Sequence, residues 1–359
     1  MEFSIQNNVI TPGLQPTLSL PLFVKRMPKI ELHIHLEGTI QPDHALQLVQ
    51  KYESDSVLKT IADVKQQYRF GNLPDFLKAM QTITDYLRSP DDIRDAALNM
   101  LRHLSTQNVR YVEFDCAVYK YTLLGHSLKD ILDSLHDAVM QAQSETKIEA
   151  NIVINLVRRF GAEAALDTVK SVIELANEKV VGFGLSGDET KYPPALYSDA
   201  FKLAKQNGYG LTVHAGEGRG PNSIWNAINH LKIDRIDHGT RAKEDDSLLD
   251  YLVEQQIPLA MCPTSNLKLN VVSSLSEHPI KEYFNLGIPV TINSDDPAIF
   301  NSDIENEFLI CADQFHFSHK DLEQLCINAA RATFQPKEKK ENLENNIREE
   351  FQKLYLNIA

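Results

Sequence analysis

Cysteine is scarce in this chain, and the few cysteines are too scattered to act as a group. They stand far apart and form no C-x-x-C pair: Cys116, Cys262, Cys311 and Cys326. This spacing argues against a cysteine-based metal site and against the disulfide framework of a small secreted protein. The usage is typical of a reducing compartment, and we expect a cytoplasmic protein.

Basic charge is also in short supply. The 49 acidic residues outnumber the 36 basic ones and give a formal net charge of -13. The average surface field of such a protein repels phosphate backbones and anionic lipid headgroups. Nucleic acids and membranes are therefore not expected partners.

Long apolar runs are absent as well. No run approaches the roughly 18 residues that a membrane-spanning helix needs. Residues 1–27 lack the basic start, apolar centre and cleavage site of a signal peptide, and Pro12, Pro16 and Pro21 interrupt their one apolar stretch. We expect residues 1–27 to form an arm outside a single domain that spans residues 28–359.

What the chain does have is an alternation of short, Val- and Ile-rich runs with longer segments of helical periodicity. This pattern is typical of βαβ units, in which helices cover parallel strands. Eight such runs in one series predict an α/β fold, a closed (β/α)8 TIM barrel. The expected strands cover residues 30–36, 109–115, 151–156, 181–185, 210–214, 235–238, 258–262 and 290–294.

Two segments depart from this alternation. Residues 41–105 are too long for one connection, which predicts extra helices inserted after the first strand. The segment from His319 onward, above all residues 329–354, is charged and helical in pattern. It predicts a helical C-terminal tail packed outside the barrel.

The first expected strand carries two histidines in alternation. His33 and His35 point to one side of a strand, and in a barrel covered by helices that side is the interior. Taken alone, such a pair is equally typical of polar residues bonded to nearby backbone. Other expected strands, however, also end in polar residues that can bind a metal or transfer a proton. They are His214 and Glu217 at the end of the fifth strand, Asp237 and His238 at the end of the sixth, and Asp295 and Asp296 at the end of the eighth.

The carboxyl ends of barrel strands meet at one face, where barrel enzymes assemble their sites. Three imidazoles and one carboxylate form a first shell for Zn2+ that leaves a position for water. We predict that this shell consists of His33, His35, His214 and Asp295. Such a metal acidifies its water, which predicts hydrolytic chemistry. The fourth strand has no lysine to bridge two metals, so one zinc ion per chain is expected.

These motifs together resemble the adenosine deaminase family of zinc-dependent barrel hydrolases. The resemblance covers about Pro28 to Leu325 and runs in order through PKIELHIH, LPDFL, SGDE, VHAGE, HG and SDDP, at residues 28–35, 73–77, 186–189, 213–217, 238–239 and 294–297. One such motif is weak, but several in the same order are specific. The resemblance implies hydrolytic deamination of a 6-aminopurine.

The resemblance also implies catalytic roles. Glu217 would protonate the purine at N1, which requires a carboxyl group that burial keeps neutral. His238 would orient the attacking water and either take its proton or stabilise its oxygen. Asp295 counts among the catalytic groups as well as among the metal ligands. Ser265 is a candidate partner that would fix the ring of His238.

Further residues are implied to contact the substrate. They are His35, Glu37, Gly187, Asp296, Phe76 and Leu77. Asp296 would bond purine N7, the backbone N–H of Gly187 would bond N3, and the two apolar side chains would cover the sugar. The remaining histidines lie away from the expected strand ends and are predicted to be surface or packing residues: His44, His103, His126, His136, His230, His278, His316 and His319.

The sequence departs from the adenosine-specific pattern at Glu37, where those members have an aspartate against the ribose. Residues 113–118 also lack the usual Arg-x-x-Pro. Glu37, SNLKL and NSDDP are similar to the adenine deaminase branch, whereas SGDE and LPDFL favour nucleosides. Adenosine, with 2′-deoxyadenosine, is the leading expected substrate; adenine and a modified adenine nucleoside of the aminofutalosine type are the alternatives.

A non-catalytic purine-binding barrel is the alternative from a different class, because a fold alone never proves a function. A binder is free to lose part of the machinery, but here the metal ligands, proton donor, water-orienting histidine and base-reading aspartate are all present. An enzyme is therefore expected. The oligomeric state and the physiological metal among zinc and its neighbours stay open.

Overall fold

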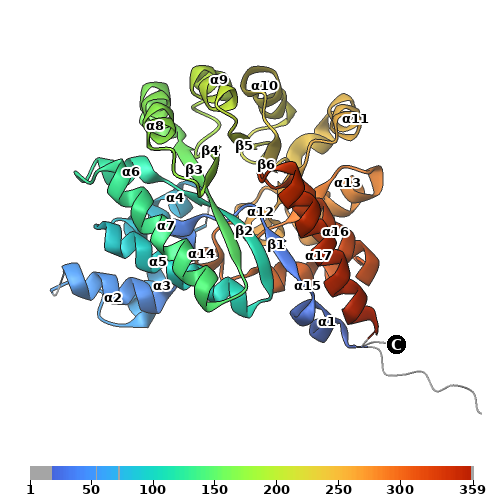
Figure 1. Ribbon diagram of the computed structural model, residues 1–359, viewed down its shortest axis with the longest axis horizontal. Coiled ribbons are helices and arrows are strands. Elements are labelled where there is room, and N and C mark those ends of the chain that lie inside the picture. Colours follow the sequence, from blue (N-terminus) through green and yellow to red (C-terminus); the bar gives the residue numbers. More distant parts are fainter. Residues whose placement is uncertain (1–17, 54, 72, 357–359) are drawn as a thin grey trace, which may run out of the picture.

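The computed structural model describes residues 18–53, 55–71 and 73–356, and it is built around eight parallel strands. Each strand pairs with its neighbour in the sequence, which confirms the predicted (β/α)8 barrel. Figure 1 shows the helices as an outer ring around the strands. The strands are β1 (Lys29–Glu31), β2 (Val109–Cys116), β3 (Glu149–Val157), β4 (Val180–Ser186), β5 (Gly210–Ala215), β6 (Arg235–His238), β7 (Leu259–Met261) and β8 (Val290–Ile292).

Most helices follow single strands and cover the outside of the barrel (Figure 1). They are α6 (Val118–Thr122) and α7 (Leu128–Glu145) after β2, α8 (Gly161–Leu175) after β3, α9 (Ser198–Gln206) after β4, α10 (Pro221–Leu231) after β5, α11 (Asp246–Gln255) after β6, α12 (Pro263–Lys268) and α13 (Ile280–Leu286) after β7, and α14 (Pro297–Phe300) and α15 (Ile304–Gln314) after β8.

The predicted insertion after the first strand is present as four helices, α2 (Pro42–Tyr52), α3 (Ile61–Gln67), α4 (Leu73–Thr84) and α5 (Pro90–Thr106). Local sequence sets where two of them begin. The side chains of Thr60 and Ser89 accept hydrogen bonds from the backbone N–H three residues later, and aspartates at those positions bond back to the cap. Such capping boxes satisfy N–H groups that a helix start leaves unpaired.

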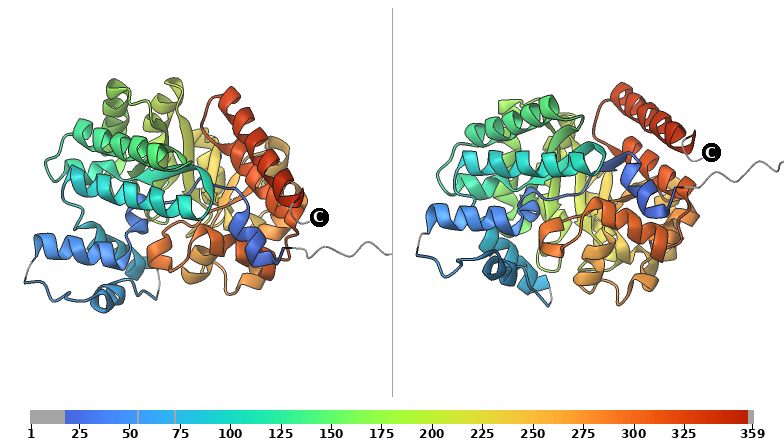
Figure 2. Two further views of the ribbon diagram at one scale, coloured as in Figure 1. Left: turned by 60° about the horizontal axis from the view of Figure 1, so that its bottom comes forward. Right: turned by 90° about the horizontal axis from the view of Figure 1, so that it is seen from below.

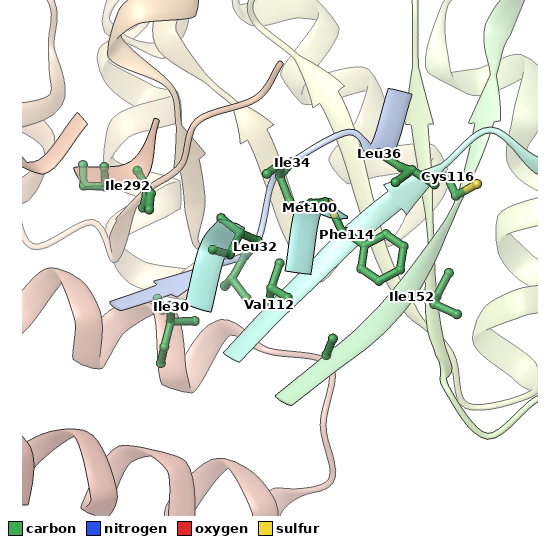
Figure 3. Packing of buried hydrophobic residues seen from close by; sticks show 14 of the residues in the cluster. Ile30, Leu32, Ile34, Leu36, Met100, Val112, Phe114, Cys116, Ile152 and Ile292 are labelled. Atoms are coloured by element: carbon green, nitrogen blue, oxygen red, sulfur yellow. The ribbon is translucent and has the colours of Figure 1, made fainter. Parts of the chain in front are cut away.

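Alternation along the segment from Ile30 to Leu36 sorts its side chains into two layers. Figure 3 shows Ile30, Leu32, Ile34 and Leu36 among the apolar side chains between the strands and α5, and all four are buried there. The residues between them, including both predicted histidine ligands, therefore face the interior of the barrel. This two-residue period is the reason the chain can pack a core and build a polar site with one strand.

The seam between β8 and β1 is where the structure departs from the expected strand limits. Ladder pairing ends at Glu31 and Ile292, earlier than the predicted 36 and 294. The amide oxygen of Asn293 accepts from the backbone N–H of Leu32 at 2.8 Å and replaces a strand-to-strand bond. Beyond it the extended chain continues as isolated bridges, and Asp295 pairs with Ile34. The barrel is thus closed partly by a side chain.

The C-terminal segment is helical, as predicted, but it also enters the barrel. Helices α16 (His319–Ala332) and α17 (Lys337–Leu356) lie side by side along one flank, red in Figures 1 and 2. Between them Phe334 fills the space beside Gly182 and Gly210, where a Cβ would lie within 3 Å of its ring. The tail therefore plugs the amino-terminal end of the barrel, opposite the strand ends that carry the predicted site.

A buried ion pair holds this plug. Arg235 donates to Glu113 at 2.9 Å and lies over the ring of Phe334. The backbone N–H of Phe334 donates to the other oxygen of Glu113 at 2.6 Å. Both charges are fully buried, so each depends on the other for compensation.

Of the predicted arm, residues 1–17 lie outside the described residues. Residues 20–26 form α1 (Leu20–Arg26), which packs against α15. Phe23 of α1 is buried and stacks on His319. In the described part of the chain, every helix is too short or too polar to cross a membrane.

The Glu113–Arg235 pair generates a stability prediction. Glu113→Gln removes the nearest counter-charge of the buried Arg235 and leaves only the more distant Asp237, at 3.9 Å, so we expect a loss of about 3 kcal/mol in the free energy of unfolding, measured by urea denaturation. The matched control is Glu149→Gln, an exposed carboxylate on the neighbouring strand, which should change it by less than about 0.5 kcal/mol. Equal effects of the two variants would contradict this account.

Candidate active site

Polar side chains from four strand ends meet at the carboxyl-terminal face of the barrel. His33 and His35 follow β1, His214 lies in β5, His238 ends β6, and Asp295 follows β8. His238 and Asp295 have positive φ angles of 67° and 62°. Left-handed backbone is costly for residues with a Cβ, and these two lie at strand ends rather than at helix caps. All five side chains are buried.

Four ligand atoms converge on one point in this face. The Nε2 atom of His214 lies 3.2 Å from that of His33 and 3.1 Å from that of His35. An oxygen of Asp295 lies 3.3 Å from Nε2 of each of these two histidines. Metal–nitrogen bonds of about 2.0–2.1 Å around a shared ion place neighbouring ligand atoms about 3.3 Å apart. The predicted quartet therefore has the spacing of a metal shell.

For His33 and His214, the far sides of the rings explain why the Nε2 atoms are free to bind a cation. Nδ1 of His33 faces the carbonyl oxygen of Ala260 at 3.4 Å. The two carboxylate oxygens of Asp237 lie 3.8 Å from Nδ1 of His33 and 3.5 Å from Nδ1 of His214. Acceptors on this side hold the ring proton at Nδ1 and leave the lone pair at Nε2. Burial and the neighbouring His33 and His238 lower the pKa of His214 well below its usual value, so this ligand is neutral.

This donor set fits a resident metal ion. Three nitrogens and one carboxylate oxygen with lone pairs turned toward one another repel unless a cation lies between them. In the described part of the chain, two overlapping groups of side chains are close enough to share a metal ion: His33, His214, His238 and Asp295 form one, and His35, Asp295 and Asp296 form the other. Nε2 of His238 lies 3.9 Å from Asp295, farther than the two ligand histidines. We therefore place His238 beside the metal shell.

His238 is held from behind by Asn266, which corrects the expectation for Ser265. Nδ1 of His238 lies 3.2 Å from the amide nitrogen of Asn266. The hydroxyl of Ser265 is buried and has no hydrogen-bond partner among the described residues. The two residues occupy successive positions of the short helix α12, and the direction of each side chain there, which the sequence does not reveal, decides which one reaches the ring.

Glu217 faces His238 across the site, with 3.5 Å between its carboxylate oxygen and Nε2. Its loop is anchored by Glu189, which accepts hydrogen bonds from the backbone N–H groups of Gly216, Glu217 and Arg219. Burial, and then the charges of Asp295 and Glu189, raise the pKa of Glu217 well above its usual value. This environment favours the protonated acid over the carboxylate.

Asp296 and Gly187 line the same cleft. One carboxylate oxygen of Asp296 is buried without a hydrogen-bond partner among the described residues, and burial together with Asp295 raises its pKa. A Cβ on Gly38 would lie 1.9 Å from this oxygen, so only glycine fits there. Gly187 has a φ of 98°, the left-handed region that favours glycine, and it presents its backbone at the end of β4.

The cleft above the metal shell has a volume of about 350 Å³. Phe76 and Leu77 of α4 are among the residues that line it. Phe76 stacks on Phe300 with ring centroids 5.1 Å apart, and Phe70 packs against both rings. The inserted helix is thus fixed to the segment after β8 by an aromatic cluster, and it forms the roof of the cleft.

Glu37 lies deep in the cleft but is already engaged. Its carboxylate accepts from the backbone N–H of Ala117 at 2.9 Å and from the hydroxyl of Tyr121 at 3.1 Å. Nearby, Lys120 pairs with Asp85 at 3.1 Å and contacts Thr84 at the end of α4. The longer side chain of Glu37 is therefore tied to the end of β2.

Several residues with a part in the site had no role in the sequence analysis. They are Glu189, Asp237, Asn266 and His278, together with Arg158, whose guanidinium donates to the carbonyl oxygen of His214 at 2.7 Å. His278 was predicted to be a surface or packing residue; it is buried and lies 3.1 Å from the amide oxygen of Asn266. Glu189, Asp237 and Asn266 stand inside or beside motifs that the sequence analysis named without giving these residues a role, whereas no pattern marks His278.

The chain matches known proteins over most of its length. Residues 28–350 match the family model described as adenosine deaminase. The chain belongs to the adenosine deaminase family. It is therefore a hydrolase that acts on a C–N bond of a cyclic amidine, as the sequence predicted, and the family is metal-dependent. Membership of this family supports hydrolytic deamination of an adenine-type ring.

Relatives of two specificities match almost the whole chain. It is 31% identical to an adenine deaminase of Acinetobacter baylyi, covering 89% of this chain and 96% of that protein. It is 33% identical to an aminodeoxyfutalosine deaminase of Streptomyces avermitilis, covering 90% and 91%. The crystal structure of an adenine deaminase from Arthrobacter aurescens superposes with a TM-score of 0.86 at 27% identity, covering 90% of this chain and 98% of that one.

The position of Asp237 generates a prediction about metal binding. Asp237→Asn replaces the carboxylate behind His33 and His214 by an amide, and we expect metal affinity to fall about 10–100-fold, measured by competition with a chelator. The control is Asp250→Asn on the exposed face of α11, which should leave affinity unchanged. Wild-type affinity in the Asp237 variant would show that this carboxylate does not orient the ligands.

Proposed function

We propose that this protein is a zinc-dependent deaminase of adenosine and 2′-deoxyadenosine that forms the corresponding 6-oxopurine nucleoside and ammonia. The observation that carries the proposal is the juxtaposition of Glu217, with its raised pKa, and the four converging ligand atoms of the metal shell. One group is a neutral acid and the other suits a cation. Hydrolysis at an amidine carbon needs both within reach of the same ring.

The chain's own residues divide the work of that reaction. Oxygen addition at C6 becomes favourable when N1 receives a proton, and Glu217 holds one at its carboxyl oxygen. His238, 3.5 Å from Glu217, orients the attacking water. Asp296 has a raised pKa and one carboxyl oxygen without a partner among the described residues, so in this proposal it donates to purine N7, while the backbone N–H of Gly187 donates to N3. These contacts would hold the base flat above the metal shell.

Zinc is the metal we propose, one ion per chain, held by His33, His35, His214 and Asp295. Nitrogen-rich ligand sets with one carboxylate are typical of catalytic zinc. When bound, the ion would lower the pKa of a water ligand toward neutrality and so supply the nucleophile.

The size of the cleft supports a nucleoside. A volume of about 350 Å³ falls in the range occupied by drug-sized ligands and exceeds what a bicyclic base fills. The part beneath Phe76 and Leu77 is available to a substituent at N9. Lys120 and Arg159 also line the cleft, and their cations would favour a substituent that accepts hydrogen bonds.

Adenine is the second candidate substrate. Glu37 occupies the position where adenosine-specific members have an aspartate, and its Oε1 is tied to Ala117 and Tyr121, so one of its two oxygens is already used within the protein. The adenine deaminase named above is among the relatives that cover nearly the whole chain. A modified adenine nucleoside of the aminofutalosine type is the remaining alternative, in line with the Streptomyces relative.

Ammonia release from adenosine, 2′-deoxyadenosine, adenine and an aminofutalosine-type nucleoside, assayed in parallel with the zinc-loaded protein, tests the substrate. We expect kcat/KM for the two simple nucleosides to exceed that for adenine. Turnover of adenine alone would show that the protein is an adenine deaminase, the second candidate function. Bound zinc without turnover of any of the four would contradict the proposal.

Glu217→Gln tests the proton donor. The amide keeps the shape of the side chain but has no acidic proton, and we expect kcat to fall about 10²–10⁴-fold with metal content unchanged. The control is Glu163→Gln on the exposed surface of α8, which should retain full activity. A Glu217 variant with more than about a tenth of the wild-type kcat would require another donor.

The pH profile follows from the raised pKa of Glu217. A donor must be protonated, and a carboxyl group with a raised pKa keeps its proton to higher pH than an exposed glutamate does. We expect kcat/KM to be maintained through mildly acidic and neutral pH and to decrease as pH rises through that pKa. A profile that instead rises with pH across the same interval would mean that Glu217 acts as a base.

A further inference from the structure

The residues around His238 indicate which of its two ring nitrogens carries the proton. This inference goes beyond the proposed function, and only its consequence for catalysis rests on that function. Behind the ring, away from the cleft, lies a buried polar chain of three residues, Asn266, His278 and Thr240. None is more than 5% exposed. The family roles used above assign nothing to them, and each hydrogen bond in the chain has a direction that can be worked out.

The direction is set by a backbone N–H, which can only donate. The N–H of Ile280 points at Nδ1 of His278 at 3.3 Å, so that nitrogen is an acceptor. Burial lowers the pKa of His278 to about 3, and the neutral ring must then carry its proton on Nε2. Nε2 lies 3.1 Å from the amide oxygen of Asn266 and donates to it. The ring also stacks on Phe315, which fixes its plane.

A second donor confirms the orientation of the Asn266 amide. The hydroxyl of Thr240 donates to the same oxygen at 2.7 Å. With its oxygen occupied by two donors, Asn266 turns its NH2 group toward Nδ1 of His238, 3.2 Å away. An NH2 group can only donate, so Nδ1 of His238 is an acceptor. The proton of the neutral His238 ring is therefore on Nε2.

The cleft side of His238 agrees with this assignment. Nε2 lies 3.9 Å from a carboxylate oxygen of Asp295, which is an acceptor, and 3.5 Å from Oε1 of Glu217, which accepts when the acidic proton is on the other oxygen. We propose that Asn266, oriented by His278 and Thr240, is a positioning residue that fixes His238 as the Nε2–H tautomer. His238 then presents a hydrogen-bond donor to the attacking oxygen and has no lone pair on that side with which to take a proton.

Asn266→Asp is the variant that reverses the direction of the hydrogen bond to Nδ1 of His238. Its carboxylate can accept from Thr240 and His278 as before, but it must also accept from His238, which draws the ring proton to Nδ1. We expect kcat to fall at least about 100-fold, since a wrong histidine tautomer costs a triad enzyme about 10⁴-fold. KM should change by less than about threefold and metal content should be unchanged, because Asn266 lies outside the metal shell. The matched control is Asn328→Asp, another buried asparagine, on α16, which introduces the same charge without touching His238 and should leave kcat unchanged.

Two substitutions of His278 separate orientation from packing. His278→Gln retains an N–H that can donate to Asn266 and should keep most of the activity, whereas His278→Leu fills the space without a donor and should lose about tenfold in kcat. Equal losses in both variants would indicate a packing role and overturn the proposal, as would an Asn266→Asp enzyme with wild-type kcat. Activity is read with whichever purine the wild-type protein deaminates.

The tautomer itself can be measured without any substrate, so failure of the proposed function and failure of this inference are distinguishable. In the zinc-loaded protein labelled with 15N-histidine, the His238 signals are assigned by their loss in His238→Gln. We expect a protonated Nε2 and an unprotonated, hydrogen-bonded Nδ1, with the pattern reversed in Asn266→Asp. A proton on Nδ1 of His238 in the wild-type protein would overturn the assignment whether or not the variants fold.

Discussion

At the carboxyl-terminal face of the barrel, the Nε2 atoms of His33 and His35 each lie 3.1 to 3.3 Å from Nε2 of His214 and from a carboxylate oxygen of Asp295, and much of the structure serves to keep them there. Lone pairs at this spacing repel until a cation compensates them, so each ligand needs support from behind. Asp237 and Ala260 supply it for His33, and the bridge between Ile34 and Asp295 supplies it through the backbone. The seam that closes the barrel is thus also the place where two of the ligands are joined.

Around this shell, neighbouring acidic residues have different surroundings. Glu189 accepts hydrogen bonds from the backbone N–H groups of Gly216, Glu217 and Arg219, whereas burial and nearby charges raise the pKa of Glu217 beside it. Asp295 and Asp296 form a similar contrast, since one lies against histidines and the other has an oxygen without a partner. A purine ring bound between the acid Glu217 and a metal ion would be suitably placed for hydrolytic attack on its amidine carbon.

Stability and chemistry are concentrated at opposite ends of the barrel. At the amino-terminal end, Phe334 and the Glu113–Arg235 pair close the interior and involve no residue of the cleft. At the other end, Phe76 and Phe300 bind the inserted helix over the site. The insertion after β1 therefore covers the cleft at the carboxyl-terminal end of the barrel, while the C-terminal tail closes the amino-terminal end.

The sequence by itself determined the order of strands and helices, because the two-residue and helical periods of apolar residues are local signals. It also determined which histidines and aspartates stand at strand ends, and hence that His33, His35, His214 and Asp295 would gather. Only the tertiary structure decided which groups stand behind them. Asn266 reaches His238 and Ser265 does not; His278 is buried against Asn266; Glu37 is tied to the end of β2; and Phe334 enters the barrel. These contacts join residues from separate elements, and the direction in which a side chain leaves a short helix or loop depends on packing that no local pattern records.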